Sequence, residues 1–499
     1  MRTAPSVIGA GSGLAPRRPP ATALVLVIAC AAQSMVVLDV SIVNVALPDI
    51  RLALGLGPAA QQWIVNAYTL GFAGLLLLGG RAADLVGARR AFLAGLGTFT
   101  AASLACGLAT GGGTLIAARA VQGVGGAVLA PATLTLIMTT FTEPAARTRA
   151  MGAWSAVIAV GGAAGAVLGG VLTQYAGWRW VFFVNVPIGA ALLAAALLHV
   201  PAGQGRPGGL RRLDLPGALA VTGGLTALVY GTVSAEAHSW GAVRVWAALA
   251  AGAALLAAFV VIEAKVAAPL VPLAILRRRT LALADLVVFG LGAAMFSMWF
   301  LLSLHMQQVL GYSALETGLA FLPGCVAIVA GARIATRLVQ RSGPRPPLVA
   351  GLALSTAGFG WLSRITADGT FAAGILGPFV LCTLGLGLAL LPVTAAATAG
   401  TPPAESGLAS GLVNASRQVG GALGLAVLAT IASRTTRAHH GPAHQALAAG
   451  YGRAFLVAAL FTACAALLSL LLPGRASARP GSRRGRGQQR PAAARPADR

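Results

Sequence analysis

The sequence predicts an all-α integral membrane protein with fourteen transmembrane helices, grouped as six, two and six. Of its 499 residues, 57% are hydrophobic and 10% are charged, whereas about 25% of the residues of a typical soluble protein are charged. The mean hydropathy of +0.81 agrees with a surface that mostly faces lipid. The same composition excludes several soluble domains, a disordered chain, a coiled coil and a disulfide scaffold.

Long apolar runs recur along the chain, and a helix needs about 20 such residues to cross the hydrocarbon core. The length of the runs favours helices over the strands of a barrel, which would alternate with a period of two. The fourteen predicted spans cover residues 22–46, 60–80, 90–110, 114–140, 148–172, 178–200, 214–234, 242–263, 281–303, 316–339, 347–366, 371–396, 406–433 and 452–473.

The early spans are separated by local signals. The first span follows Arg17 and Arg18 and at first resembles a signal peptide, but it continues well past Cys30 and is too long for one. The glycine- and arginine-rich segment 80–90 separates the second span from the third, and the glycines of 111–113 separate the third from the fourth.

The later boundaries carry clearer signals. Residues 178–180, with the sequence Trp-Arg-Trp, form an interfacial anchor at the start of the sixth span. Asp214 is the predicted N-cap of the seventh span, and Ser313 with Glu316 forms a capping box before the tenth. The polar Asp368 separates the eleventh span from the twelfth.

The distribution of basic residues predicts that both termini lie in the cytoplasm. Membrane proteins keep most of their lysines and arginines on the cytoplasmic side, and with this orientation most of the 36 basic residues lie inside. The basic loop residues that lie outside are Arg51, Arg179, Arg244, Arg364, Arg434, Arg437 and Arg453.

Two polar connections, 201–213 and 264–280, bracket the seventh and eighth spans and divide the chain. The segments 80–89 and 331–339 follow the second span of each six-span group and share a glycine- and arginine-rich pattern, as in secondary transporters built from parallel repeats. The predicted parts are a cytoplasmic N-terminal segment (1–21), a six-helix bundle (22–200), a linker with two extra transmembrane helices (201–280), a second six-helix bundle (281–473) and a basic tail (474–499).

The tail is rich in arginine, proline, glycine and alanine, which predicts disorder. A basic tail beside a membrane is typical of an anchor to anionic headgroups. Binding to nucleic acid is the alternative, but the tail has no aromatic residue that could stack on bases. We therefore predict membrane lipid, and not nucleic acid, as its partner.

Three charged residues lie well inside the predicted spans: Asp39, Arg119 and Arg417. A charge at the centre of a span costs at least ~2.5–3.5 kcal/mol unless it is paired or hydrated. Burial favours the neutral form of a carboxyl group, which makes Asp39 a candidate proton carrier, flanked by Gln33 and Asn44 on neighbouring stripes of the helix. The alternative is a structural hydrogen bond between helices.

Arg119 cannot lose its proton, so inside a span it needs a carbonyl group, a carboxylate or water. It shares a helix face with Gln122. We predict a fixed charge that tunes the proton affinity of Asp39; the alternative is a guanidinium that snorkels to the interface.

A second polar stripe lies in the thirteenth span, where Asn414, Arg417 and Gln418 are flanked by glycines. The stripe either lines a cavity or bonds to a neighbouring helix, and the sequence favours neither.

No enzyme signature is present. The chain lacks a P-loop, the HExxH motif of metalloproteases and the nucleophile elbow of hydrolases. Its five cysteines stand apart within apolar runs, which fits neither a disulfide nor a zinc site. We predict no catalytic residue, no metal site and no cofactor.

Several segments together resemble the major facilitator superfamily, and within it the fourteen-span drug:proton antiporters. The resemblance extends from about residue 22 to 473. Its motifs are the first-helix motif at 38–48, the loop motif at Gly80, Asp84, Gly87, Arg89 and Arg90, the fourth-helix motif at Arg119, Gln122, Gly123 and Gly125, the antiporter motif at Gly165, Gly169 and Gly170, and the sixth-helix signature at 178–189.

Three residues depart from the family pattern. Ala82 and Leu85 replace the usual leucine and arginine of the loop motif, which weakens the ion-pair network expected there. Ala166 replaces the usual proline of the antiporter motif.

The resemblance implies a monomeric antiporter in the cytoplasmic (inner) membrane of a bacterium, which exports an amphipathic drug or antibiotic in exchange for protons and confers resistance. It implies that Asp39 carries the proton, that Arg119 couples it to transport, and that the loop motif latches one conformation. The two bundles would rock around a midplane cavity. The polar residues of that cavity would be Gln33, Asn44, Gln122, Asn414, Arg417 and Gln418.

Two other functions stay open at this point. The first is the export or import of a specific metabolite, coupled to protons, by the same fold. The second is a membrane enzyme or a structural scaffold, which the missing catalytic constellation disfavours.

Overall fold

The computed structural model describes residues 20–201, 213–238, 241–267, 269–399 and 405–472. The predictions for the tail, and for the N-terminal segment up to residue 19, lie outside the described residues.

Within the described residues the chain is helical and contains no strand. The helices before the inserted pair are α1 (Pro20–Ala53), α2 (Pro58–Val86), α3 (Ala88–Gly107), α4 (Gly112–Thr140), α5 (Pro144–Ala176), α6 (Trp180–Phe183) and α7 (Asn185–His199). The inserted pair is α8 (Leu215–His238) and α9 (Val243–Lys265). The helices after it are α10 (Leu273–Leu276), α11 (Arg279–Gln308), α12 (Ala314–Ala320), α13 (Leu322–Ser342), α14 (Arg345–Leu362), the π-helix η2 (Phe371–Leu376), α15 (Gly377–Thr398), α16 (Ser406–Ala438) and α17 (Ala443–Ser469).

The prediction of a multi-pass helical membrane protein is confirmed. In the described part of the chain, eleven helical segments are long and apolar enough to cross a membrane. The helices α3, α5 and α14, which carry three further predicted spans, are not among the eleven. The sixth, tenth and twelfth predicted spans each consist of two consecutive helices: α6 and α7, α12 and α13, and η2 and α15.

Local sequence signals explain where several helices begin. The Ser313 hydroxyl accepts a hydrogen bond from the backbone N–H of Glu316, whose carboxylate in turn accepts one from the Ser313 N–H, as the predicted capping box requires. Asp214 Oδ1 accepts the backbone N–H of Gly217 at 2.9 Å and caps α8. Gly87, with φ of 100°, lets the chain turn from α2 directly into α3.

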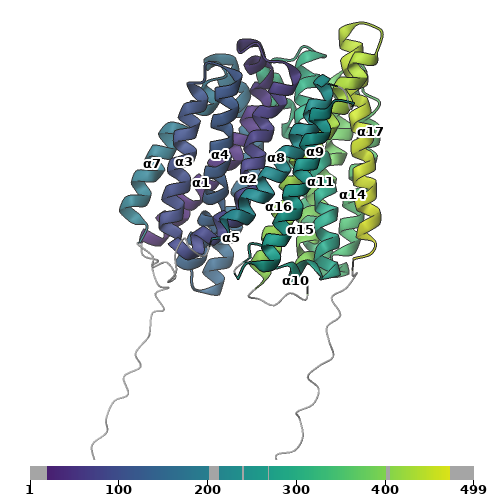
Figure 1. Ribbon diagram of the computed structural model, residues 1–499. Helices are drawn as coiled ribbons and strands as arrows, with labels where there is room; N and C mark the ends of the chain where they lie inside the picture. Colours follow the sequence, from purple (N-terminus) through teal and green to yellow (C-terminus); the bar gives the residue numbers. More distant parts are fainter. Residues whose placement is uncertain (1–19, 202–212, 239–240, 268, 400–404, 473–499) are drawn as a thin grey trace, which may run out of the picture.

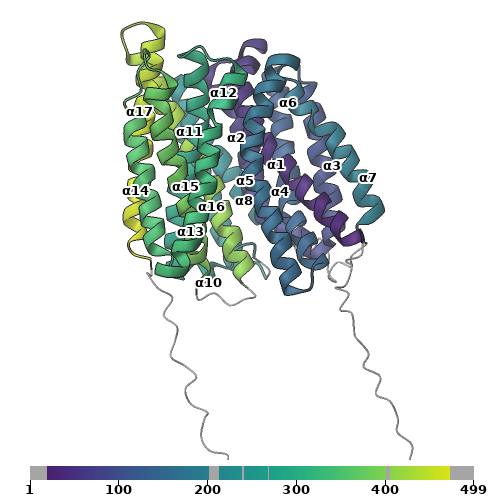
Figure 2. The same ribbon diagram turned by 180° about the vertical axis from the view of Figure 1, so that it is seen from behind.

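The helices form two groups that stand side by side (Figures 1 and 2). The N-terminal group, α1–α7, meets the C-terminal group, α11–α17, along two main lines: α2 packs against α16, and α5 packs against α12 and α13. The first described residue of α1 and the last of α17 lie at the same end of the molecule (Figure 1). We call this end the inner end and the opposite end the outer end.

The glycines of the fourth-helix motif and of the antiporter motif lie at close helix contacts. A Cβ atom added at Gly125 would lie 2.6 Å from the backbone nitrogen of Phe99 in α3, and one at Gly169 would lie 2.9 Å from the Cα atom of Ile42 in α1. Only a residue without a side chain allows such an approach. The remaining members of this set also face backbone or Cβ atoms of a neighbouring helix: Gly123 at α2, Gly165 at α1 and Gly170 at α12.

Candidate functional site

Asp39 and Arg119 form a buried ion pair in the interior of the N-terminal group. Asp39 lies on the middle part of α1 and is 0% exposed, and Arg119 lies on α4 and is 1% exposed. Arg119 Nη1 lies 2.5 Å from Asp39 Oδ2. A charge that is removed from water in this way is stabilised by its partner and by further hydrogen bonds.

Two amide side chains complete the surroundings of the carboxylate. Gln122 Nε2 donates to Asp39 Oδ1 at 2.7 Å, and Gln122 Oε1 accepts from Arg119 Nη1 at 2.7 Å. Asn185, on α7, donates to the same Oδ1 atom at 3.2 Å. The carboxylate therefore accepts three hydrogen bonds from three different side chains.

The guanidinium of Arg119 is held on its remaining sides by α2. Its Nε donates to the carbonyl oxygen of Ile64 at 3.2 Å, and its central carbon lies 4.3 Å from the centre of the Tyr68 ring. A cation above an aromatic face is stabilised by the ring quadrupole. The cluster thus has one negative and one positive side chain, joins α1, α2, α4 and α7, and is closed to solvent.

Three residues of this cluster were not predicted. Asn185 lies within the sixth-helix signature, but nothing in its spacing relates it to Asp39, 146 positions earlier. Ser103, on α3, accepts a hydrogen bond from Gln122 Nε2 at 2.8 Å. Tyr68 gave no signal because aromatic residues are common in spans. The sequence had placed Gln122 at the substrate cavity, and the structure places it inside the ion-pair cluster, with 0% of its surface exposed.

The loop-motif residues lie at the inner end, around the turn from α2 to α3. Arg89 Nη2 donates to the carbonyl oxygen of Leu197 at 2.7 Å, which ties α3 to the end of α7. Asp84 and Arg90 are exposed, Gly87 makes the turn, and Gly80 faces the side chain of Pro131 in α4.

The six predicted cavity residues do not form one group. Gln33 faces α4, where its Oε1 accepts a hydrogen bond from Thr133 at 3.3 Å. Asn44 donates from Nδ2 to Val40 in its own helix. On α16, Arg417 Nη2 donates to Asn414 Oδ1 at 2.8 Å, and the Arg417 guanidinium lies 5.7 Å from the ring centre of Phe296. The fifth and sixth, Gln122 and Gln418, lie in the ion-pair cluster and on α16.

Gln418 faces α2 across the contact between the two groups. The helices α2 and α16 run in opposite directions, and Gln62 Nε2 donates to the carbonyl oxygen of Leu425 at 3.0 Å, while a Cβ atom added at Gly411 would lie 3.2 Å from Leu77. This register places Gln418 about one helical turn nearer the inner end than Asn66.

Asn66, one turn after Gln62 on α2, is a further polar residue that the sequence did not single out. It is 0% exposed, and neither its Nδ2 nor its Oδ1 has a hydrogen-bond partner among the described residues. The Oε1 atom of Gln418 also lacks a partner there. A buried amide without partners loses its hydration without compensation, which costs about 1–3 kcal/mol, so the contact between α2 and α16 carries unused donor and acceptor groups.

The two groups are closed against each other at the outer end. Ser303 on α11 donates to the carbonyl oxygen of Asn44 at 2.9 Å, and Gln307 Nε2 donates to that of Val45 at 3.0 Å. The backbone N–H of Leu315 donates to Gln174 Oε1 at 3.3 Å. Together with the bond from Gln62 to Leu425, these contacts join the outer halves of both bundles.

In the described part of the chain, no group of three or more histidine, cysteine, aspartate and glutamate side chains could hold a metal ion.

Comparison with known proteins gives concordant matches. The family model described as Major Facilitator Superfamily matches residues 29–425. The cephamycin export protein CmcT of Amycolatopsis lactamdurans is 47% identical over 91% of this chain and 93% of its own length. The puromycin resistance protein pur8 of Streptomyces alboniger is 42% identical over 90% of each chain. The tetracenomycin C resistance and export protein of Streptomyces glaucescens is 34% identical over 80% of this chain and 73% of its own.

Solved structures with low sequence identity share the fold. An inward-facing, unoccupied bacterial homologue of the human lysosomal transporter Spinster has a TM-score of 0.62 at 16% identity and covers 91% of this chain and 97% of its own. An auto-inhibited peptide transporter of the POT family has a TM-score of 0.64 at 18% identity, with coverage of 93% and 99%.

Proposed function

Because this chain belongs to the Major Facilitator Superfamily, we propose that it is an antiporter that exports amphipathic drugs or antibiotics, confers resistance to them, and is driven by protons that enter in exchange. The names of three relatives support the export of antibiotics: they refer to cephamycin export, puromycin resistance, and tetracenomycin C resistance and export. These relatives are transporters, so we assign no enzymatic activity.

The buried pair of Asp39 and Arg119 is the observation that carries the coupling mechanism. In the present conformation the carboxylate has three hydrogen-bond donors and no access to solvent. A proton can reach Asp39 only after the cluster opens. Once protonated, Asp39 is neutral and loses most of its attraction for the guanidinium, so α1 and α4 are free to separate.

Proton uptake and substrate release then belong to the same conformation, the one in which the cluster has opened. The ionised carboxylate stabilises the closed cluster, and the protonated carboxyl group stabilises a state in which Arg119 has moved toward other partners or water. A proton that binds one conformation more tightly than the other shifts the population of both. Arg119 keeps its positive charge in both conformations. The shift in population therefore depends only on whether Asp39 is protonated.

The polar groups of α16, with Asn66 of α2, form the proposed binding surface for the substrate. Arg417 and Asn414 are partly accessible and lie on the inner half of α16, and Gln418 and Asn66 lie deeper, below the closed outer contacts. Such a surface offers apolar contact with a few hydrogen-bonding groups, which fits an amphipathic compound. Gln33, Asn44 and Gln122 would act through helix contacts instead, because their side chains are bonded within the protein or lie at the outer contact.

The inner end would face the cytoplasm, and the contacts at the outer end would then close the protein toward the outside. This orientation follows from the basic residues of the loops. We also propose that the protein is a monomer that crosses the cytoplasmic membrane fourteen times. The helices α3, α5 and α14 would be the three spans beyond the eleven apolar segments. Asp84, Arg89 and Arg90 would latch one conformation.

The experiment uses inverted membrane vesicles from a host that lacks its own pumps. Lactate-driven acidification of the vesicle interior should drive uptake of an exported antibiotic, and the same antibiotic should release protons, seen as recovery of a quenched pH-sensitive dye. A protonophore should stop both. Uptake that continues after the pH difference has collapsed would contradict proton coupling, and a lack of transport for a broad panel of amphipathic drugs would instead favour a specific metabolite.

A further inference from the structure

The inserted helix α8 lies across the line where the two bundles meet. It packs against both α2 of the N-terminal bundle and α16 of the C-terminal bundle (Figure 1). One buried apolar cluster joins all three helices and contains Leu70 of α2, Leu225, Val229 and Val233 of α8, and Ala422 and Ala426 of α16. A rocking motion of the bundles changes the angle between α2 and α16, so α8 cannot keep both contacts unchanged.

The outer half of α8 is bonded to α16. The hydroxyl of Thr430 donates to the carbonyl oxygen of Thr232 at 3.4 Å, and Arg434 Nη2 donates to that of Ala235 at 3.2 Å. Both contacts lie within the last two turns of α8.

The inner part of α8 is fitted to α2. Gly74 of α2 approaches Thr222 so closely that an added Cβ atom would overlap the Thr222 side chain. At the inner end lie two buried acids, Asp214 at the start of α8 and Glu263 near the end of α9. Both acids are 3% exposed.

These two acids are built into the inner end of the inserted pair. Asp214 Oδ1 accepts the N–H of Gly217, and Glu263 Oε2 accepts the N–H of Val271 at 3.0 Å. The other oxygen of each carboxyl group is buried and has no hydrogen-bond donor among the described residues.

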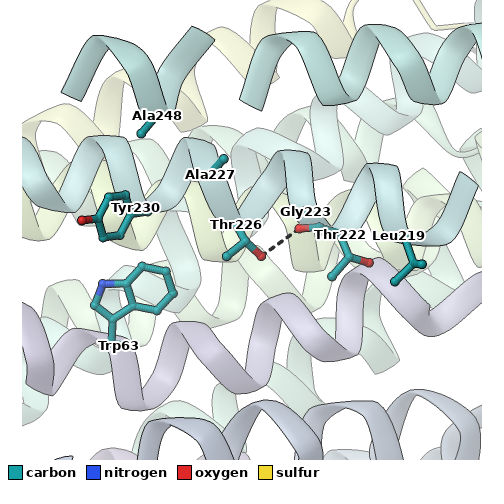
Figure 3. A pocket seen from close by; sticks show the side chains of 8 residues that line it. All are labelled: Trp63, Leu219, Thr222, Gly223, Thr226, Ala227, Tyr230 and Ala248. Carbon is teal, nitrogen blue, oxygen red and sulfur yellow. Dashed lines mark hydrogen bonds between the residues drawn. The ribbon is translucent and has the colours of Figure 1, made fainter. Parts of the chain in front are cut away.

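A groove runs along α8 beside α2 and includes the Thr222 side chain of the Gly74 contact. Its volume is about 490 Å³, and it is lined by Trp63 of α2, by Leu219, Thr222, Gly223, Thr226, Ala227 and Tyr230 of α8, and by Ala248 of α9. Figure 3 shows the rings of Trp63 and Tyr230 on the two sides of the groove, with centres 6.5 Å apart. The hydroxyl of Thr226 is turned to the carbonyl oxygen of Thr222 in its own helix, so the groove holds no bond between α2 and α8.

We propose that the pair α8 and α9 is a strap between the bundles. Its inner part is held to the N-terminal bundle at the close contact of Gly74 with Thr222, and its outer half moves with α16 of the C-terminal bundle. The groove between Trp63 and Tyr230 is the space that changes as the bundles rock. This inference rests on the proposed function, because it assumes that the bundles alternate.

Two cross-links in the full-length protein test the outer half of the strap. In a variant with its native cysteines replaced, a short bis-methanethiosulfonate reagent joins Thr232→Cys to Thr430→Cys in one protein and Trp63→Cys to Tyr230→Cys in another. The first link connects parts that move together, and export should stay above half of its rate before linking. The second link spans the groove, and export should fall at least fivefold and return when dithiothreitol removes the link.

Single-cysteine variants treated with the same reagent control for its direct effects. Export that continues with the Trp63–Tyr230 link in place would contradict the strap proposal. Export that stops with the Thr232–Thr430 link in place would also contradict it. The export rate of each variant before linking is the reference for that variant. A protein that does not export in response to the proton gradient even before linking would contradict the proposed function and not the strap.

Discussion

Asp39 and Arg119 are joined twice, once directly and once through the amide of Gln122. The direct contact runs from Arg119 Nη1 to Asp39 Oδ2, and the amide accepts from the same Nη1 and donates to Asp39 Oδ1. The three side chains therefore form a closed ring of hydrogen bonds. Because each member bonds the other two, loss of the charge on Asp39 weakens the whole ring and not a single contact.

Asp39→Asn should uncouple the protein from the proton gradient. Asparagine resembles the protonated carboxyl group in shape and cannot bind or release a proton in this range of pH. We expect gradient-driven accumulation of drug in inverted vesicles to fall at least tenfold, while exchange of labelled for unlabelled drug continues. Asp368→Asn, which changes an exposed loop residue, is the matched control and should transport normally. Unchanged accumulation with Asp39→Asn would exclude this residue as the proton carrier.

The ion pair should also be visible as a coupling of stabilities. Arg119→Met leaves a buried carboxylate without its partner, which costs about 3–5 kcal/mol. In the double variant with Asp39→Asn no uncompensated charge is left, so its unfolding temperature in detergent should lie above that of Arg119→Met alone. The difference between the double variant and the sum of the single ones measures the interaction. Additive changes would mean that the two side chains do not stabilise each other.

Much of the fold could be predicted from the composition and from the length of the apolar segments, because every transmembrane helix must cross the same thickness of hydrocarbon. The capping roles of Ser313 and Asp214 were also predictable, since a cap depends on residues three positions apart. The surroundings of Asp39 were predictable only in part. Arg119 was suggested by its charge, whereas Asn185 and Ser103 come from other helices, and no local period relates them to Asp39.

The same reason explains why the sequence could not show what Gln122 faces. Gln122 follows Arg119 by three positions and shares its helix face, so a polar face toward a cavity and a polar face toward Asp39 look alike in the sequence. Asn66 gave no signal, because a single amide in an apolar span is not distinctive until its lack of hydrogen-bond partners among the described residues is seen.

The contact between α1 and α5 should tolerate almost no added volume. Gly169→Ala places a methyl group 2.9 Å from the Cα atom of Ile42, and the two helices must separate to admit it. We expect a loss of stability of about 1–3 kcal/mol, measured as a lower unfolding temperature and less protein in the membrane. Gly152→Ala, on the same helix, meets no atom within 4 Å and is the control. Equal unfolding temperatures for the two variants would contradict the close packing.

Asn66 and Gln62 offer a direct comparison of a bonded and an unbonded amide on one face of α2. Gln62→Leu removes the bond to the carbonyl oxygen of Leu425 and should lower the unfolding temperature. Asn66→Leu removes a buried amide that has no partner and should raise it, with a gain of up to about 1–3 kcal/mol. The gain stabilises the conformation that is closed at the outer end, so export by Asn66→Leu should become slower, by up to tenfold for each ~1.4 kcal/mol. Thermal unfolding of the purified protein and initial rates in vesicles measure both effects. If Asn66→Leu destabilises the protein as Gln62→Leu does, the amide of Asn66 is bonded after all, and its place in the binding surface is lost.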